Sequence, residues 1–324
     1  MSLNKNTVDK FFYFFITIHL ILWTLIPSLT NNNLPLDTIE HLAWGSNLDW
    51  GFDKHPPLSA FFPEIFYQIF GNQDWAYYLL SQIFVVIAFF VVFKFAEELF
   101  KNKTLGLISV LLLESIYFYN FTTPEFNVNV SQLPFWALTV YFFWKGLNSK
   151  NKTYWILFGV SSAFGFLSKY LFIYLLVSLF IYFFWNLKKH KKFLPNYFLS
   201  IVIFLLILTP HFIWLFENNF TTIFYGLKRS ALDEVVLINH LKNPIIFISK
   251  QILILLPFLI MFSTLLKKIK IKLNIKDKKI LFLIIVNLTP LFLVLFTSIV
   301  TGAEIRTMWM TPFYLFFGTL FIEN

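Results

Sequence analysis

Apolar runs of about 15 to 22 residues recur along the whole sequence, separated by Lys- or Asn-rich connectors. A helix rising about 1.5 Å per residue needs roughly 20 residues to cross a hydrocarbon core of about 30 Å, so the pattern predicts membrane-spanning helices. The fold class expected is an all-α polytopic membrane protein. Ten spans are predicted, at residues 11–30, 75–93, 105–119, 128–144, 154–166, 171–185, 198–215, 245–266, 280–300 and 308–322.

The composition agrees with this interpretation. Of the 324 residues 58% are hydrophobic and 13% are charged, whereas a soluble domain has roughly 25% charged residues. One globular core cannot hide this much apolar surface, which excludes a soluble enzyme. The chain has no cysteine, which excludes a disulfide framework, a thiol nucleophile and a Cys-ligated metal. The first apolar run is too long for a signal peptide and lacks a small-residue cleavage site, so we expect it to be retained.

The basic residues predict the orientation of the chain. Nineteen of the 26 Lys and Arg residues fall in connectors that share one side of the predicted topology, and seven of these lie between Lys267 and Lys279. The positive-inside rule makes that side cytoplasmic. The net charge of +9 therefore reflects orientation and does not indicate nucleic-acid binding.

The opposite side carries 11 of the 17 acidic residues, Asp233 and Glu234 among them, and the two longest connectors, residues 31–74 and 216–244. Function on polytopic proteins tends to reside in such elaborated loops. We therefore expect residues 1–324 to form one transmembrane domain with its chemistry in the first extracytoplasmic loop, residues 31–74. Lys169 joins two short predicted spans near the same boundary, and an ionisable residue at this depth is a functional candidate.

The first loop has a distinctive sequence. Its first part alternates apolar and polar residues with helical spacing, which predicts a short helix along the membrane surface with Asp37 near its N-terminus. Capping of this helix is an alternative role for the Asp37 carboxylate. The Pro56-Pro57 pair predicts a stop, followed by a second interfacial helix over Leu58–Phe70.

The loop resembles the first-loop signature of bacterial glycosyltransferase family 39, the protein-mannosyltransferase-like enzymes of the GT-C superfamily, to which transferases of aminoarabinose and galactosamine to lipid A are related. Weaker blocks follow in the same order, up to about residue 230. The sequence departs from the pattern at Thr38, where an acid is expected, and at Glu125, which replaces an Asp. The matching residues are Asp37, Trp44, Leu48, Asp49, Trp50, Gly51, His55, Pro56, Pro57 and Leu58 in the first loop, then Thr123-Pro124-Glu125, Phe135-Trp136-Ala137-Leu138, Leu167-Ser168-Lys169-Tyr170, Thr209-Pro210, Trp214 and Asn218-Asn219-Phe220.

The resemblance implies a GT-C helical bundle with an extracytoplasmic active site that uses a polyprenyl-phosphate sugar as donor and inverts the anomeric centre. No metal site and no cofactor are expected. A carboxylate should deprotonate or orient the acceptor, and cations should hold the departing phosphate. We assign catalysis to Asp37, with Glu40 sharing the role, the donor phosphate to Lys54, His55, Lys169, Arg229 and Arg306, and the sugar or acceptor to Glu125, Trp44, Trp50 and Asp53.

Structural interpretations of these residues remain open. Lys228-Arg229 would serve as headgroup anchors, Arg306 would pair with Glu304, Lys169 would snorkel to the interface, and Glu125 would cap the next helix. Metal ligation by His41, Glu40 and His55 is a further alternative with no diagnostic spacing.

The expected function is transfer of a sugar from a polyprenyl phosphate to lipid A or another envelope glycan, by a multi-pass inner-membrane enzyme with a periplasmic active site. If the acceptor is an ionised phosphate, Asp37 would orient it. Protein O-mannosylation and, in another class, a transporter or lipid flippase are the alternatives. The sequence stops just after the tenth predicted span, whereas full-length relatives carry further spans, so a C-terminally truncated enzyme is one expectation.

Overall fold

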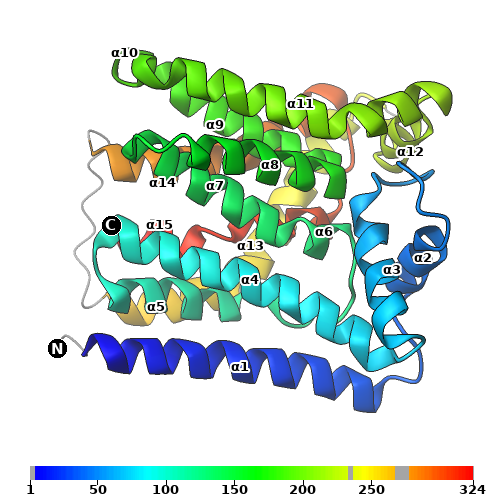
Figure 1. The fold of residues 1–324 in the computed structure, drawn as a ribbon, viewed down its shortest axis with the longest axis horizontal. Helices are drawn as coiled ribbons and strands as arrows, with labels where there is room; N and C mark the ends of the chain where they lie inside the picture. The colour runs from blue at the N-terminus through cyan, green and yellow to red at the C-terminus, as the bar shows by residue number, and fades with distance from the viewer. Residues whose placement is uncertain (1–3, 233–235, 267–276, 324) are drawn as a thin grey trace.

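The computed structural model describes residues 4–232, 236–266 and 277–323, and these residues form helices and connecting segments without a strand. The long helices lie side by side, as Figure 1 shows. The α-helices are α1 (Lys5–Thr30), α2 (Leu36–Gly45), α3 (Leu58–Phe70), α4 (Asp74–Phe100), α5 (Lys103–Leu111), α6 (Val128–Ser131), α7 (Leu133–Asn148), α8 (Thr153–Ser168), α9 (Ile173–Trp185), α10 (Leu187–His190), α11 (Leu194–Glu217), α12 (Thr221–Arg229), α13 (Asn239–Leu266), α14 (Lys278–Thr301) and α15 (Phe317–Glu323).

The bundle has two chemically different ends. The start of α1, the α4–α5 connector and α10 lie at the end that holds both termini, and the short helices α2, α3 and α12 gather at the other end (Figure 1). The basic connectors described by the structure thus share one end, as predicted, and the positive-inside rule makes it the expected cytoplasmic end. Of the basic run between Lys267 and Lys279, the part at 267–276 lies outside the described residues, as do Asp233 and Glu234.

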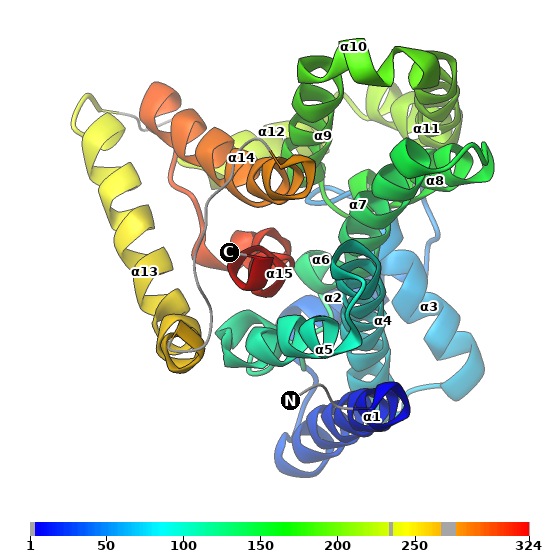
Figure 2. The same cartoon turned by 90° about the vertical axis from the view of Figure 1, so that its left-hand side faces the viewer.

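Five helical stretches of the described chain are long and apolar enough to cross a membrane: Lys5–Thr30, Asp74–Phe100, Leu187–Glu217, Asn239–Leu265 and Lys278–Thr301. Figure 2 shows α4 between α1 and α7, and most of its apolar window is buried. The outer helices α1, α11 and α13 instead expose large apolar side chains, for example Leu25, Leu206 and Leu253. Exposed apolar side chains of this kind are suited to contact with lipid. A helix is suited to lipid as well, because it satisfies its backbone hydrogen bonds internally.

The predicted count of ten spans is not confirmed, because five stretches of the described chain have the length and hydropathy of a span. The predicted helix 105–119 is α-helical only to Leu111 and continues as two 3₁₀ segments, Leu112–Ser115 and Tyr117–Tyr119. The last predicted span begins as a 3₁₀ segment, Thr307–Tyr314, and only then becomes α15. At nine residues, α5 rises only about 14 Å. Hydropathy marks apolar segments but does not measure the length of the helix that they form.

The 3₁₀ break after α5 is held by polar contacts. Asn120 Nδ2 donates to the carbonyl of Glu114 over 2.6 Å, and Glu114 Oε2 lies 2.9 Å from His19 Nδ1 on α1. The pair ties the break to the first helix where both pass through the apolar part of the bundle.

Candidate functional site

Helix α2 is docked on the segment that precedes α6. The Thr38 hydroxyl donates to the carbonyl of Phe126 over 3.2 Å, and the backbone N–H of Asp37 donates to Glu125 Oε1 over 3.2 Å. These contacts join residues that lie almost 90 positions apart in the sequence. They bring the carboxyl groups of Asp37 and Glu125 to one place.

Both carboxyl groups are free of the capping roles that were considered for them. Pro35 is the N-cap residue of α2 and makes no side-chain cap bond, and Asp37 lies in the first turn. Asn127 caps α6, because its side chain accepts from the backbone N–H groups of Asn129 and Val130. Glu125 instead accepts from Asp37 and from Asn127 Nδ2.

The rest of the first loop is fixed by α11 and α12. Trp50 contributes its carbonyl to His211 Nδ1 over 2.6 Å, and Thr222 donates to the carbonyl of Phe52 over 2.7 Å. Between them, a Cβ on Gly51 would lie 2.3 Å from the ring of Trp214. Gly51 is therefore required because the indole packs directly on the backbone at this position.

The three carboxylates of the site influence one another. Burial, followed by the charge of Glu40, raises the pKa of Asp37. Burial, followed by the charge of Asp37, raises the pKa of Glu125. A carboxylate with a raised pKa is a stronger base once it is ionised. Glu40 also contacts the ammonium group of Lys54 directly, so it neutralises a neighbouring cation as well as acting on Asp37.

Three cations act on the same carboxyl group. The charges of Lys54, Lys169 and Arg229 each lower the pKa of Asp37, in opposition to burial and Glu40. They come from the first loop, the α8–α9 connector and the end of α12, so the fold gathers three distant segments around Asp37. Arg229 is exposed, but its field reaches the site.

Lys169 is buried, with 6% of its surface exposed. Its Nζ donates to Asn129 Oδ1 over 2.6 Å and lies 5.1 Å from the ring centroid of Trp309. Burial lowers the pKa of Lys169 well below its ordinary value, and only the charge of Asp37 opposes this. Snorkelling to the interface is therefore not the arrangement that the structure has.

The histidines of the loop are poor cations. Burial lowers the pKa of His41 to about 4, and burial with the nearby charges of His41 and Lys169 lowers the pKa of His55 well below its ordinary range. Their ring centroids are 6.3 Å apart. Among the described residues no group of three or more His, Asp and Glu side chains is placed to hold a metal ion, so the alternative cluster of His41, Glu40 and His55 does not form there.

The remaining candidates lie around the site with less defined roles. Trp44 stacks on Phe52 with ring centroids 5.4 Å apart, and so supports the loop. Trp50 and Asp53 are both exposed. Arg306 lies 3.4 Å from Glu304, as its structural interpretation predicted.

Sequence reasoning missed four residues that shape the site. Asn129 and Trp309 hold Lys169, and His211 supports Trp50. The ring of Tyr225 lies 5.9 Å from Lys54 Nζ and 6.3 Å from the ring of His55. None of these residues belongs to a motif with its partner, so only the fold brings them together.

Known proteins resemble the chain in sequence and fold. A sequence model of the family described as dolichyl-phosphate-mannose-protein mannosyltransferase matches residues 54–214. The undecaprenyl phosphate-alpha-4-amino-4-deoxy-L-arabinose arabinosyl transferase of Wigglesworthia glossinidia brevipalpis is 29% identical over 143 residues, which are 43% of this chain and 25% of that protein. Crystal structures of ArnT from Cupriavidus metallidurans match at 15% identity, with a TM-score of 0.70 when bound to undecaprenyl phosphate and 0.73 in the apo state.

Both sequence matches are to glycosyltransferases, and the solved structures share the fold of this chain. The resemblance inferred from the first loop is thereby confirmed. The likeness to ArnT extends over 95% and 97% of this chain but only 59% of the ArnT chain. The chain therefore spans about three fifths of the length of the solved structures that it matches.

Proposed function

We propose that the chain transfers a sugar from a polyprenyl phosphate to lipid A at the extracytoplasmic face of the inner membrane. The ArnT-like fold and the relative named for arabinosyl transfer from undecaprenyl phosphate support this. The observation that carries the proposal is the arrangement around Asp37, where the charges of Glu40 and of three cations act on one carboxyl group and Glu125 accepts a hydrogen bond from the Asp37 backbone. Glycosyl transfer from a lipid phosphate needs both kinds of group.

In the proposed reaction an acceptor oxygen attacks the anomeric carbon of the donor from the face opposite the phosphate. The new bond joins that carbon to the acceptor, the bond between the same carbon and the phosphate oxygen breaks, and the configuration inverts. If the acceptor is a hydroxyl group, its proton passes to the Asp37 carboxylate. If the acceptor is a phosphate of lipid A, which is already ionised, no proton moves and Asp37 orients the acceptor.

Cations must hold the departing phosphate as its charge grows. We assign this role first to Lys169 and Arg229, because the ammonium group of Lys54 is already engaged by Glu40. Lys169 is suited to bind the donor phosphate. Burial lowers the pKa of its side chain, and a phosphate bound beside it would favour the ammonium form. His55, whose pKa is lowered, would contribute a hydrogen bond rather than a charge.

No protein metal ligand is needed in this scheme, since lysine and arginine supply the positive charge that a metal ion would otherwise provide. The charge of Glu40 helps to keep the pKa of Asp37 raised, and Glu125 fixes the backbone of Asp37 by accepting its N–H. Trp50 and Asp53 remain our candidates for contact with the sugar or the acceptor because both are exposed at the loop surface.

Protein O-mannosylation is a second candidate, favoured by the family model that matches residues 54–214. Mass spectrometry of lipid A from cells with and without the gene distinguishes the two functions. An added sugar on lipid A that disappears with the gene supports the proposal. Identical lipid A spectra accompanied by a lost hexose on envelope proteins would replace it with protein glycosylation.

The role of Asp37 is tested by Asp37→Asn, which keeps the shape of the side chain but removes its charge. Transfer should fall by roughly 100-fold or more, the scale of a lost general base, while the amount of protein in the membrane stays the same. Asp49→Asn is the matched control, because Asp49 is an exposed carboxylate of the same loop that accepts only from its neighbour Trp50 among the described contacts. Equal activity in both variants would remove Asp37 from the mechanism.

A further inference from the structure

A cavity of about 780 Å³ lies at the expected cytoplasmic end of the bundle. Helix α2, which carries Asp37, lies at the other end (Figure 1). It is lined by the first residues of α1, the last turns of α4 and the start of α5. Its lining lysines are Lys5, Lys94, Lys101 and Lys103, and its carboxylates are Glu97 and Glu98. The sugar-transfer proposal makes no use of this cavity.

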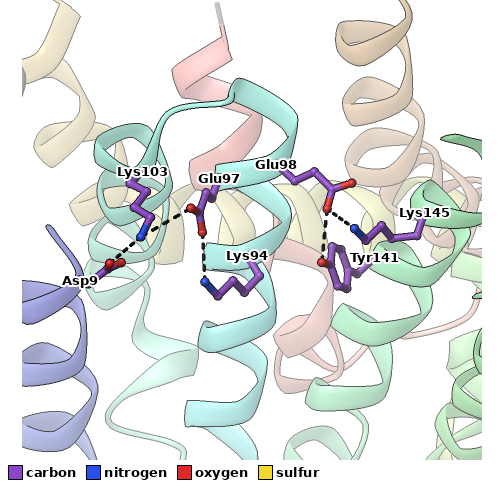
Figure 3. Close-up of polar contacts among 7 residues, drawn as sticks. All are labelled: Asp9, Lys94, Glu97, Glu98, Lys103, Tyr141 and Lys145. Atoms are coloured by element: carbon purple, nitrogen blue, oxygen red, sulfur yellow. Dashed lines mark hydrogen bonds and ion pairs between the residues drawn. The ribbon is translucent and has the colours of Figure 1, made fainter. Parts of the chain in front are cut away.

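Several of the lining side chains form ion pairs, which Figure 3 shows. Lys103 Nζ lies 2.5 Å from Asp9 Oδ2 and 3.8 Å from Glu97 Oε1, and Lys94 Nζ lies 3.1 Å from Glu97 Oε2. These contacts bind α1, α4 and α5 together.

A second group ties α4 to α7. Glu98 Oε2 lies 2.7 Å from Lys145 Nζ and accepts from the Tyr141 hydroxyl over 3.3 Å. Across both groups, three carboxylates therefore meet three lysines.

The two other lining lysines are left over. Lys5 and Lys101 are exposed, and neither belongs to an ion pair among the described residues. The cavity and its surroundings therefore hold two positive charges in excess.

The backbone at Lys101 is a second, independent feature. Lys101 is left-handed, with φ at 54° and ψ at 31°, at the C-cap of α4. Glycine or asparagine usually occupies this conformation, and a lysine there is strained. A cationic residue thus lines the cavity at a position where a neutral glycine or asparagine is the usual choice.

We propose that this cavity binds the phosphate headgroup of an anionic phospholipid of the cytoplasmic leaflet. The phosphate would lie between Lys5 and Lys101, because the paired carboxylates would repel it from the rest of the cavity. The acyl chains would follow the outer face of α1, where Phe11 and Phe14 are 55% and 64% exposed. A phosphate-binding end next to an apolar helix face matches the two parts of a phospholipid and not those of a free anion.

The test uses the whole purified protein in nanodiscs of phosphatidylcholine, with or without phosphatidylglycerol, read by thermal unfolding and by native mass spectrometry of retained lipid. The wild type should retain phosphatidylglycerol and unfold at a higher temperature in its presence. The double variant Lys5→Ala with Lys101→Gly should lose at least tenfold in retention and most of the thermal increment. Lys150→Ala with Lys152→Ala is the control, because it removes two exposed lysines in the α7–α8 connector that do not line the cavity.

Lys101→Gly alone separates binding from architecture. Glycine relieves the left-handed strain, so the variant should unfold at the same or a higher temperature in phosphatidylcholine, yet gain less from phosphatidylglycerol. Equal losses in the control pair would reduce the effect to general surface charge and overturn the site. An equal thermal increment from inorganic phosphate in phosphatidylcholine nanodiscs would overturn the lipid assignment. Since sugar transfer is not the readout, these outcomes leave the proposed function unaffected.

Discussion

The substitution Gly51→Ala examines how tightly the first loop is held against α11. The added Cβ would lie 2.3, 2.4 and 2.7 Å from Cε3, Cζ3 and Cδ2 of the Trp214 ring. Carbon atoms in contact are roughly 3.5–4.0 Å apart, so the closest approach is about 1.2 Å too short. The loop or the indole must therefore move.

Overpacking of this kind costs about 1–3 kcal/mol. If the loop moves instead, the hydrogen bonds from His211 to the Trp50 carbonyl and from Thr222 to the Phe52 carbonyl are strained, at about 0.5–1.5 kcal/mol each. Either route gives about 1–3 kcal/mol. If that energy displaces the loop from the catalytic geometry, kcat/KM should fall about 5- to 150-fold.

The assay is sugar transfer with purified protein in nanodiscs, normalised to folded protein, together with thermal unfolding. Gly226→Ala is the control, since Gly226 lies on α12 and a Cβ there meets no atom within 4 Å. Trp214→Ala should remove most of the added cost of Gly51→Ala in a double-mutant cycle. Wild-type activity and stability in Gly51→Ala would refute the packing argument.

Three further predictions concern charge. Burial raises the pKa of Asp37 above its ordinary 3.8, so sugar transfer that needs the Asp37 carboxylate should be lost on acidification at a pH above that value. Lys54→Met removes a positive charge that lowers this pKa, and should therefore move the acid limb of the kcat/KM profile to higher pH. An acid limb at the wild-type pH would contradict the coupling between Lys54 and Asp37. Lys169→Met should raise the donor KM about 10- to 150-fold, the effect of about 1.5–3 kcal/mol for a bond to a charged group, whereas an unchanged donor titration would exclude phosphate binding. His19→Leu and Glu114→Leu should each cost about 1–3 kcal/mol in thermal unfolding by leaving a polar partner unpaired, and the double variant should cost less than the sum; additive losses would mean that the pair is not coupled.

Much of the helical architecture is predictable from hydropathy, because lipid-facing and buried helices both require apolar side chains. The second loop helix, Leu58–Phe70, was predicted with its observed bounds from the Pro56-Pro57 pair that precedes it, and in the structure Gly71 is its C-cap residue. The change from α to 3₁₀ geometry after Leu111 was missed. The contact of Glu114 with His19, 95 residues earlier, holds the break, and no local pattern encodes a contact over such a separation in the sequence.

In the candidate site too, contacts between residues near in the sequence were predictable and contacts between distant residues were not. Asp37, Glu40 and Lys54 are close in the sequence, and their proximity in the fold follows from one short helix and its turn. The ion pair between Glu40 and Lys54 was nevertheless not predicted. Because this pair engages the Lys54 ammonium group, we place Lys54 after Lys169 and Arg229 among the proposed phosphate ligands.

The long-range neighbours of Lys169 could not be predicted from the sequence. Asn129 lies 40 residues before Lys169, and Trp309 lies on the last 3₁₀ segment. Both are ordinary residues in apolar surroundings, so nothing in their local sequence marks them as neighbours of a buried ammonium group.

The hydroxyl of Thr38 constrains which mutations could restore two adjacent acids in this loop. The side chain is 1% exposed and donates to the carbonyl of Phe126. An ionised aspartate or glutamate at position 38 could not donate there, and its oxygens would be buried against another acceptor. Regaining the pair would therefore require a compensating change around residues 125–127, and a library that varies position 38 alone should recover hydroxyl or small neutral side chains.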